Sequence, residues 1–235
     1  MEYLGYYICG ALILVCIIIS VVAQARVYSA NHKYSKTASS LDMTGAELAR
    51  ELARRANISV NIRSTGGSLS DHYDPRDKSI NISQANHSSK SISAQAIVAH
   101  EFGHALQDSE NYFPFKIRQV TVKISNFVSR MFIPVILLGF LFEILWFTGV
   151  GNIIIYAYVG IYVVSFIVSL VTLPVEFNAS RRAKKLLVQE GLTEQEMDGV
   201  HDVLNAAAMT YVASFMLNLV YLLRFFFLLK IFSRD

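Results

Sequence analysis

The sequence predicts a mainly α integral membrane protein with about four transmembrane helices and a small α+β domain. Hydrophobic residues make up 53% of the 235 residues and charged residues only 17%, so the chain is more apolar and less charged than an ordinary soluble domain. Charged residues also avoid several blocks that reach the roughly 20 residues a helix needs to cross a bilayer. These two observations exclude a purely soluble protein. Short stretches of alternating polarity in the remaining chain predict the sheet of the small domain.

The first apolar block covers residues 4–23. A cleaved signal peptide needs a basic start and an apolar core of about 7–15 residues, whereas the leading residues here are Met1, Glu2 and Tyr3 and the apolar run is longer. We therefore expect a first transmembrane helix within residues 1–25. Cys9 and Cys16 lie seven positions apart in it, on nearly the same helical face, and are expected to act as small packing residues rather than as a disulfide framework.

The second and third blocks predict three more spans. Residues 131–175 are too long for one helix, contain only one charged residue, Glu143, and break at the turn-forming residues 148–152. This pattern predicts a transmembrane hairpin made of helices 2 and 3. Residues 203–235 supply transmembrane helix 4 and a tail, in which Arg224 can reach the headgroups by snorkelling.

The distribution of basic residues predicts the topology. With four spans, residues 26–130 and 176–202 share one side of the membrane, and together they hold 18 of the 21 Lys and Arg residues. The positive-inside rule places this side in the cytoplasm. We therefore expect a multi-pass protein of the cell membrane, in contact with the lipid bilayer, whose polar segments face the cytoplasm. The net charge of +3 is too small and too scattered to indicate a nucleic-acid partner.

Residues 26–130 are expected to form the small α+β domain. Asp42 or Thr44 can cap a first helix. Its apolar residues recur every four positions, at Leu48, Leu52 and Ala56. Two alternating stretches, residues 58–62 and 79–82, predict strands separated by a loop.

The next helix contains the motif with the clearest chemistry. Ser93 is expected to cap a helix over residues 94–107, which includes His100-Glu101-Phe102-Gly103-His104, an H-E-x-x-H sequence. Residues four apart share a helical face, so both imidazoles can bind one metal ion while Glu101 reaches the water on that metal. A helix with two surface histidines is the plainer alternative. The other histidines lack this spacing and are expected to be ordinary polar residues: His32, His72, His87 and His201.

A catalytic zinc ion needs a third protein ligand. A histidine six residues after His104, which some zinc enzymes use, is not present in the sequence. The best remaining candidate is Glu176, 72 residues further on, where the third span leaves the membrane on the side of the histidine helix. Taken alone, Glu176 is as readily an acid at a membrane edge. It opens the connector of residues 176–202, in which Thr193 and Glu196 form a capping box for the last helix.

Together these segments resemble the bacterial membrane zinc metallopeptidases of the YugP type and, more distantly, the HtpX heat-shock proteases and CaaX prenyl proteases. The resemblance is carried by residues 100–107 (HEFGHALQ), by Glu176-Phe177 followed by Ala179, and by residues 70–76 (SDHYDPR). It implies a zincin-like catalytic domain of the gluzincin type, with His100, His104 and Glu176 as metal ligands. The distant relatives place an aspartate four residues after the glutamate, where this chain has Ser180.

From the chemistry of the motif we expect one catalytic Zn²⁺ and hydrolysis of peptide bonds. The zinc would activate a water molecule, and Glu101 would act as general base, passing the proton to the leaving amine. A donor for the oxyanion is also needed, and His201, Asn205 and Tyr211 are the candidates. The substrate is expected to lie extended along a strand edge, for which residues 80–82 are the first choice.

Other functions fit the sequence less well. A site-2-type intramembrane protease would carry the motif inside a span, whereas this motif is flanked by the polar Gln95 and by residues 107–110. A zinc-binding scaffold or chaperone-like protein would normally use four ligands with many cysteines. A transporter could use Glu143, but the spans are few and lack repeat symmetry. We therefore expect a zinc-dependent, membrane-embedded endopeptidase that acts on proteins or peptides in membrane protein quality control.

Overall fold

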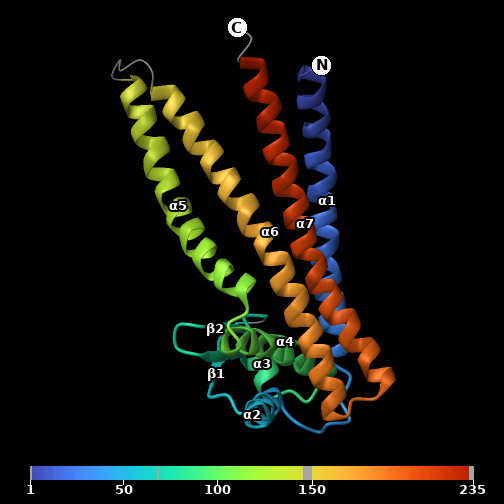
Figure 1. Cartoon of the computed structure of the whole chain (residues 1–235). Helices are drawn as coiled ribbons and strands as arrows, with labels where there is room; N and C mark the ends of the chain where they lie inside the picture. Colours follow the sequence, from blue (N-terminus) through green and yellow to red (C-terminus); the bar gives the residue numbers. More distant parts are fainter. Residues whose placement is uncertain (1, 68, 145–149, 233–235) are drawn as a thin grey trace. The chain divides into compact units, whose positions relative to one another are not determined.

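The computed structural model of the protein describes residues 2–67, 69–144 and 150–232 (Figure 1). The chain is mainly helical, with one small sheet. In chain order the elements are α1 (Glu2–Tyr34), α2 (Gly45–Ala56), β1 (Asn61–Thr65), β2 (His72–Asp74), β3 (Ser79–Ser83), α3 (Gln84–His87), α4 (Ile92–Ser109), α5 (Phe113–Ile144), α6 (Val150–Glu190) and α7 (Glu194–Phe232).

The chain divides into two compact units. The helical unit comprises Met1–Ser20, Ile117–Leu173 and Val212–Asp235, and the mixed unit comprises Val21–Lys116 and Pro174–Tyr211. The mixed unit holds the sheet together with α2, α3 and α4. Helices α1, α5, α6 and α7 each contribute residues to both units. The five-segment division expected from the sequence stays a prediction.

Three helices of the described chain are long and apolar enough to cross a membrane: Tyr3–Tyr34, Val159–Glu190 and Glu194–Ile231. This agrees with an integral membrane protein, while the fourth expected span stays a prediction. The turn expected at residues 148–152 falls partly outside the described residues, and α6 already begins within it at Val150. Helix α1 also continues well past residue 25, because the polar residues that follow contain neither glycine nor proline.

In the helical unit, the two cysteines are free and buried, as predicted. They pack with Ile13 and Val220 in a small apolar cluster. The guanidinium of Arg224 donates a hydrogen bond to the hydroxyl of Tyr6 at 2.9 Å and lies 4.5 Å from the centre of its ring. The side chain of Glu143 lies outside the described part of the structure. Among the described residues, α1 and α7 therefore pack in this unit through an apolar cluster and through the hydrogen bond and cation–π contact of Arg224 with Tyr6.

In the mixed unit, the strand order is β1-β3-β2, with β1 parallel and β2 antiparallel to β3. The central position of β3 means that both of its edges are paired, and Ile80 and Ile82 are fully buried. The prediction that residues 80–82 offer an edge to a substrate is therefore wrong. Strand β2 lies where the sequence indicated only a loop, and it is an edge strand.

The predicted helix caps are largely confirmed. Thr44 begins α2 with a complete capping box, in which its hydroxyl accepts from the amide of Glu47 and the Glu47 carboxylate accepts from the amide of Thr44. Asp42, the alternative cap, instead lies in a turn at φ +49°. Thr193 and Glu196 make the same reciprocal pair at the start of α7. Each box satisfies amide groups that the first helical turn leaves without partners.

Helix α4 begins two residues earlier than expected. Its cap is Ser91, whose hydroxyl accepts from the amide of Ala94, rather than Ser93. Ser93 lies within the first turn and donates its hydroxyl to Oδ1 of Asn31 on α1 at 2.6 Å. Both serines suit a cap, but the hydroxyl of Ser93 is used in this tertiary hydrogen bond.

Candidate metal centre

Three side chains converge on one point in the mixed unit. His100 and His104 come from one face of α4 and Glu176 from α6, and their potential ligand atoms all lie within 4.8 Å of one another. Nε2 of His100 is 3.1 Å from Oε2 of Glu176, and Nε2 of His104 is 3.7 Å from Oε1 of the same carboxylate. Glu176 is only 2% exposed. The structure thus brings together all three residues that the sequence suggested as metal ligands.

A glycine allows α4 and α6 to approach so closely. A Cβ atom at Gly103 would lie 2.8 Å from the carbonyl oxygen of Ala179 and 3.2 Å from its Cα. Both atoms are backbone and cannot yield easily. Gly103 occupies a variable position of the H-E-x-x-H motif, three positions after His100 and directly before His104, and its small size lets the third candidate ligand come within reach.

A buried amide fixes the orientation of His104. The Gln107 side chain is fully buried, and its Nε2 donates to the carbonyl oxygen of Val175 at 2.8 Å and to Oδ1 of Asn178 at 2.9 Å. Its Oε1 must therefore face Nδ1 of His104, 2.9 Å away. Because an amide oxygen only accepts, Nδ1 carries the proton and Nε2 presents a lone pair toward Glu176.

Ser180 lies beside Nδ1 of His100, as Gln107 lies beside Nδ1 of His104. Its Oγ lies 3.2 Å from Nδ1 of His100. The hydroxyl oxygen can accept a hydrogen bond from a protonated Nδ1. Nε2 of this histidine then also presents its lone pair toward Glu176. The shorter serine therefore makes contact with the first histidine even though the distant relatives have an aspartate there. Hydrogen bonds of this kind orient metal-binding imidazoles in many proteins.

Glu101 adjoins the three candidate ligands and contacts the edge strand. Its Oε2 accepts a hydrogen bond from the backbone amide of Tyr73 in β2 at 3.0 Å. Burial raises the pKa of Glu101 to about 7; nearby His100 lowers it and the Glu176 carboxylate adds to the rise. A carboxylate with a pKa near neutrality suits a general base.

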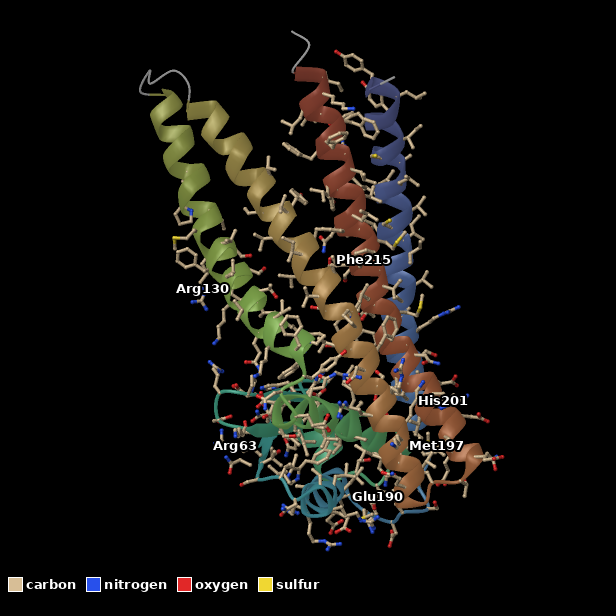
Figure 2. All side chains as sticks on the ribbon, viewed as in Figure 1. Arg63, Arg130, Glu190, Met197, His201 and Phe215 are labelled. Carbon is tan, nitrogen blue, oxygen red and sulfur yellow. The ribbon has the colours of Figure 1, made fainter. Side chains whose placement is uncertain are left out.

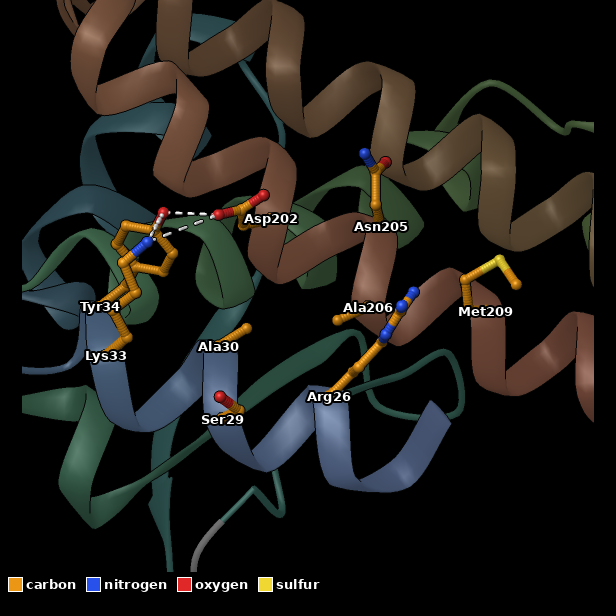
Figure 3. A pocket seen from close by; sticks show the side chains of 9 residues that line it. All are labelled: Arg26, Ser29, Ala30, Lys33, Tyr34, Asp202, Asn205, Ala206 and Met209. Atoms are coloured by element: carbon orange, nitrogen blue, oxygen red, sulfur yellow. Dashed lines mark hydrogen bonds and ion pairs between the residues drawn. The ribbon is translucent and has the colours of Figure 1, made fainter. Parts of the chain in front are cut away.

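The three residues expected as candidate hydrogen-bond donors to the oxyanion lie in different places. Tyr211 lines the same cavity as His100 and Glu101. Asn205 lines a separate cavity between α1 and α7 (Figure 3) and accepts a hydrogen bond from Nζ of Lys184 at 3.0 Å. His201 is exposed on the first half of α7 (Figure 2). Of the three, the structure brings only Tyr211 to the histidine motif.

Sequence reasoning missed two contributors to this site. Gln107 could have been found, because it follows His104 by three positions on the same face of a helix. Tyr73 lies in a segment that carries the family resemblance, but its strand is three residues long and forms by pairing with β3, so the sequence did not place it beside Glu101. Its hydroxyl also donates to Oδ2 of Asp108 at 2.9 Å, which ties β2 to the end of α4.

Comparison with known proteins identifies the class. Residues 9–230 match the family described as "Putative neutral zinc metallopeptidase", and the chain therefore belongs to this family. It is similar to the "Putative membrane protease YugP" of Bacillus subtilis (strain 168), with 40% identity over 205 residues that cover 86% of this chain and 88% of the relative. The resemblance inferred from the sequence motifs is confirmed. No solved structure matches the chain.

Family membership implies a zinc ion, and the residues present fit one. Two imidazole nitrogens and one carboxylate oxygen are the donor set of many catalytic zinc sites, which keep a fourth position for water or substrate. His100, His104 and Glu176 offer this set within 4.8 Å. Both imidazoles present Nε2 toward the shared carboxylate, as a common metal position requires.

Proposed function

We propose that this protein is a zinc-dependent membrane endopeptidase whose single zinc ion is held by His100, His104 and Glu176. The observation that carries the proposal is the convergence of these three buried or half-buried side chains from two helices. The hydrogen bonds that Gln107 and Ser180 accept from the Nδ1 atoms of the two histidines support it, because they hold both imidazoles in the orientation needed for a shared metal ion.

Glu101 is the proposed general base. Zinc bound at this site would polarise the scissile carbonyl and lower the pKa of its water to about 7. Glu101 lies beside that position and would take the proton from the water and deliver it to the leaving amine. Burial raises the pKa of Glu101 and the positive charge of zinc would lower it, so the carboxylate would be ionised and able to take the proton near neutral pH.

The outer edge of β2 is the proposed site of the substrate backbone. The amide of Tyr73 donates to Glu101 rather than to β3, so it points away from the sheet and toward the candidate metal centre. The amide and carbonyl of one strand residue point to the same side. A substrate added along this edge would therefore meet the free carbonyl side of Tyr73, while the Tyr73 amide holds the general base next to the substrate backbone.

Tyr211 is the proposed donor to the oxyanion, since it shares the cavity of His100 and Glu101. We expect Tyr211→Phe to lower kcat by about 10²- to 10³-fold, the usual effect of losing one oxyanion donor. Zinc content should stay at the parent level. The matched control is Asn205→Leu in the separate cavity, which should keep the parent kcat. Equal kcat for Tyr211→Phe and the parent would remove Tyr211 from the mechanism.

Gln107 is the proposed positioning residue for His104. We expect Gln107→Leu to weaken zinc binding by roughly 10- to 100-fold, as loss of an outer partner usually does. Gln107→Glu, which keeps an acceptor for Nδ1, should bind zinc more tightly than Gln107→Leu. Competition with a chromophoric chelator measures these affinities.

The control for Gln107 is Gln95→Leu. Gln95 is equally buried in α4 and donates to the carbonyl oxygen of Met43 at 3.2 Å, so its loss costs a buried hydrogen bond that does not involve the candidate ligands. If both leucine variants weaken zinc binding equally, the effect of Gln107 is on the fold and not on His104.

The proposed function is tested on the purified full chain in lipid nanodiscs. We expect one zinc ion per chain by metal analysis, cleavage of an unfolded protein substrate, loss of cleavage after chelation and its return when zinc is added. Zinc bound at this ratio without cleavage of any unfolded or membrane-bound protein would favour a scaffold instead.

We further propose that the site acts at the cytoplasmic face in membrane protein quality control, because most basic residues flank the spans on that side.

A further inference from the structure

A cavity of about 150 Å³ adjoins the candidate metal centre in the mixed unit. His100 and Glu101 form part of its wall, so whatever occupies the cavity lies next to the reacting groups. The rest of the wall comes from α1, α7, the first turns of α4 and the loop before β2. Most of that wall is aliphatic: Val27, Leu69, Ile97, Val203, Leu204 and Ala207.

The polar groups in the wall are engaged with the protein. Oδ1 of Asp71 accepts from the amide of Ser83 at 2.8 Å, and its Oδ2 accepts from the side chain of Asn86 at 2.9 Å. Oδ1 of Asn31 accepts from the hydroxyl of Ser93 at 2.6 Å. An acidic side chain entering the cavity would meet the like charges of Asp71 and Glu101, and any charged side chain would lose its water against the six aliphatic residues of the wall, which is costly. The cavity therefore favours an apolar group.

We propose that this cavity is the specificity pocket of the peptidase and that it holds an apolar substrate side chain, up to the size of a phenyl group, from a residue next to the scissile bond. This inference rests on the proposed function and names its substrate class. The size limit follows from the volume, because apolar cavities of about 150 Å³ hold one benzene molecule. Leucine, isoleucine, methionine and phenylalanine fit this limit, and tryptophan exceeds it.

Two wall residues allow the volume of the pocket to be changed, one substitution enlarging it and the other reducing it. Leu69 lies in the loop before β2 with φ +56°, a region that a bulky residue rarely adopts. Leu69→Gly would remove the side chain, open the pocket and suit that backbone. Ala207 contributes only a methyl group from α7, so Ala207→Leu would fill the pocket.

The test uses quenched peptides that differ only at the two residues flanking the scissile bond, with Gly, Leu, Phe, Trp, Lys or Asp at one of them. For the parent, kcat/KM should be at least about tenfold higher with Leu or Phe than with Gly, Lys or Asp at one of the two positions. Ala207→Leu should lower the Leu-to-Gly ratio about tenfold, and Leu69→Gly should raise the Trp-to-Leu ratio about tenfold.

The matched control is Ala30→Leu, which adds the same bulk to the separate cavity between α1 and α7 (Figure 3). It should keep the parent ratios. A preference for Lys or Asp, or ratios that are the same in the parent and both pocket variants, would overturn the pocket. Binding of the same peptides to zinc-loaded Glu101→Gln gives a second readout. Leucine-selective binding without cleavage by the parent would contradict the peptidase and support the pocket.

Discussion

Glu101→Gln is expected to reduce peptide cleavage by about 10²- to 10⁴-fold, the contribution usual for a general base. Glutamine has nearly the same shape and can still accept the hydrogen bond from the amide of Tyr73, so the local structure should persist. It cannot accept a proton from water, and only the chemical step should suffer. Zinc content should stay at the parent level, because Glu101 is not among the three converging ligands.

The pH profile gives an independent check on Glu101. The carboxylate must be ionised to act as a base, so cleavage by the parent should fall as the pH drops through its pKa. That pKa is raised to about 7 by burial, and the positive charge of zinc would bring it lower. The acid limb of kcat/KM should therefore lie at or below pH 7. It should disappear from the residual activity of Glu101→Gln.

Glu110→Gln is the matched control for Glu101→Gln. Glu110 follows the same helix, is about half exposed and pairs with Arg182. Its replacement should keep both cleavage and the acid limb. If Glu101→Gln cleaves at the parent rate, another group takes the proton and the assignment of the general base is wrong.

The sequence predicts the helical half of the site well because its information is local. The i, i+4 spacing alone places His100 and His104 on one face with Glu101 beside them. No periodicity links residues 72 positions apart, so Glu176 could be matched to the histidines only through its place at the end of the third predicted span and through the family resemblance. The close approach that joins them depends on Gly103 against Ala179, a packing fact that a single sequence does not express.

The sheet is harder to predict because strand order depends on distant pairing. Alternating polarity indicated a strand near residues 79–82, but it could not show that β3 is central and paired on both sides. We therefore propose that the substrate binds along β2 rather than β3. Strand β2 has three residues, too few to show an alternating pattern in the sequence. The start of α4 was also hard to predict, because Ser91 and Ser93 both suit an N-cap. The hydroxyl of Ser93 donates to the distant Asn31, and Ser91 is the cap.

Glu176→Ala is expected to weaken zinc binding by more than the roughly 10- to 100-fold expected for the outer partner Gln107. The variant removes one of three ligands, and the carboxylate is the group that both imidazoles face. Cleavage should fall to background at zinc concentrations that saturate the parent. Metal analysis after dialysis and cleavage assays across a zinc titration measure both effects.

A stability readout separates loss of the ligand from damage to the fold. Zinc that binds only the folded protein stabilises it by about 2.7 kcal/mol at a concentration 100 times its Kd. Adding zinc should therefore raise the Tm of the parent but not that of Glu176→Ala. Without zinc, the Tm of the variant should be no lower than that of the parent, since Glu176 is a buried carboxylate close to Glu101 and its charge is costly to bury.

Glu190→Gln is the matched control for Glu176→Ala, because Glu190 has an equally buried side chain on α6. Its carboxylate faces Arg55 at 3.2 Å and lies away from the two histidines. This variant should keep zinc, cleavage and the zinc-dependent rise in Tm, even if its own Tm drops. If Glu176→Ala holds zinc as tightly as the parent, the third ligand is another residue, and the convergence of α4 and α6 at this point has a purely structural role.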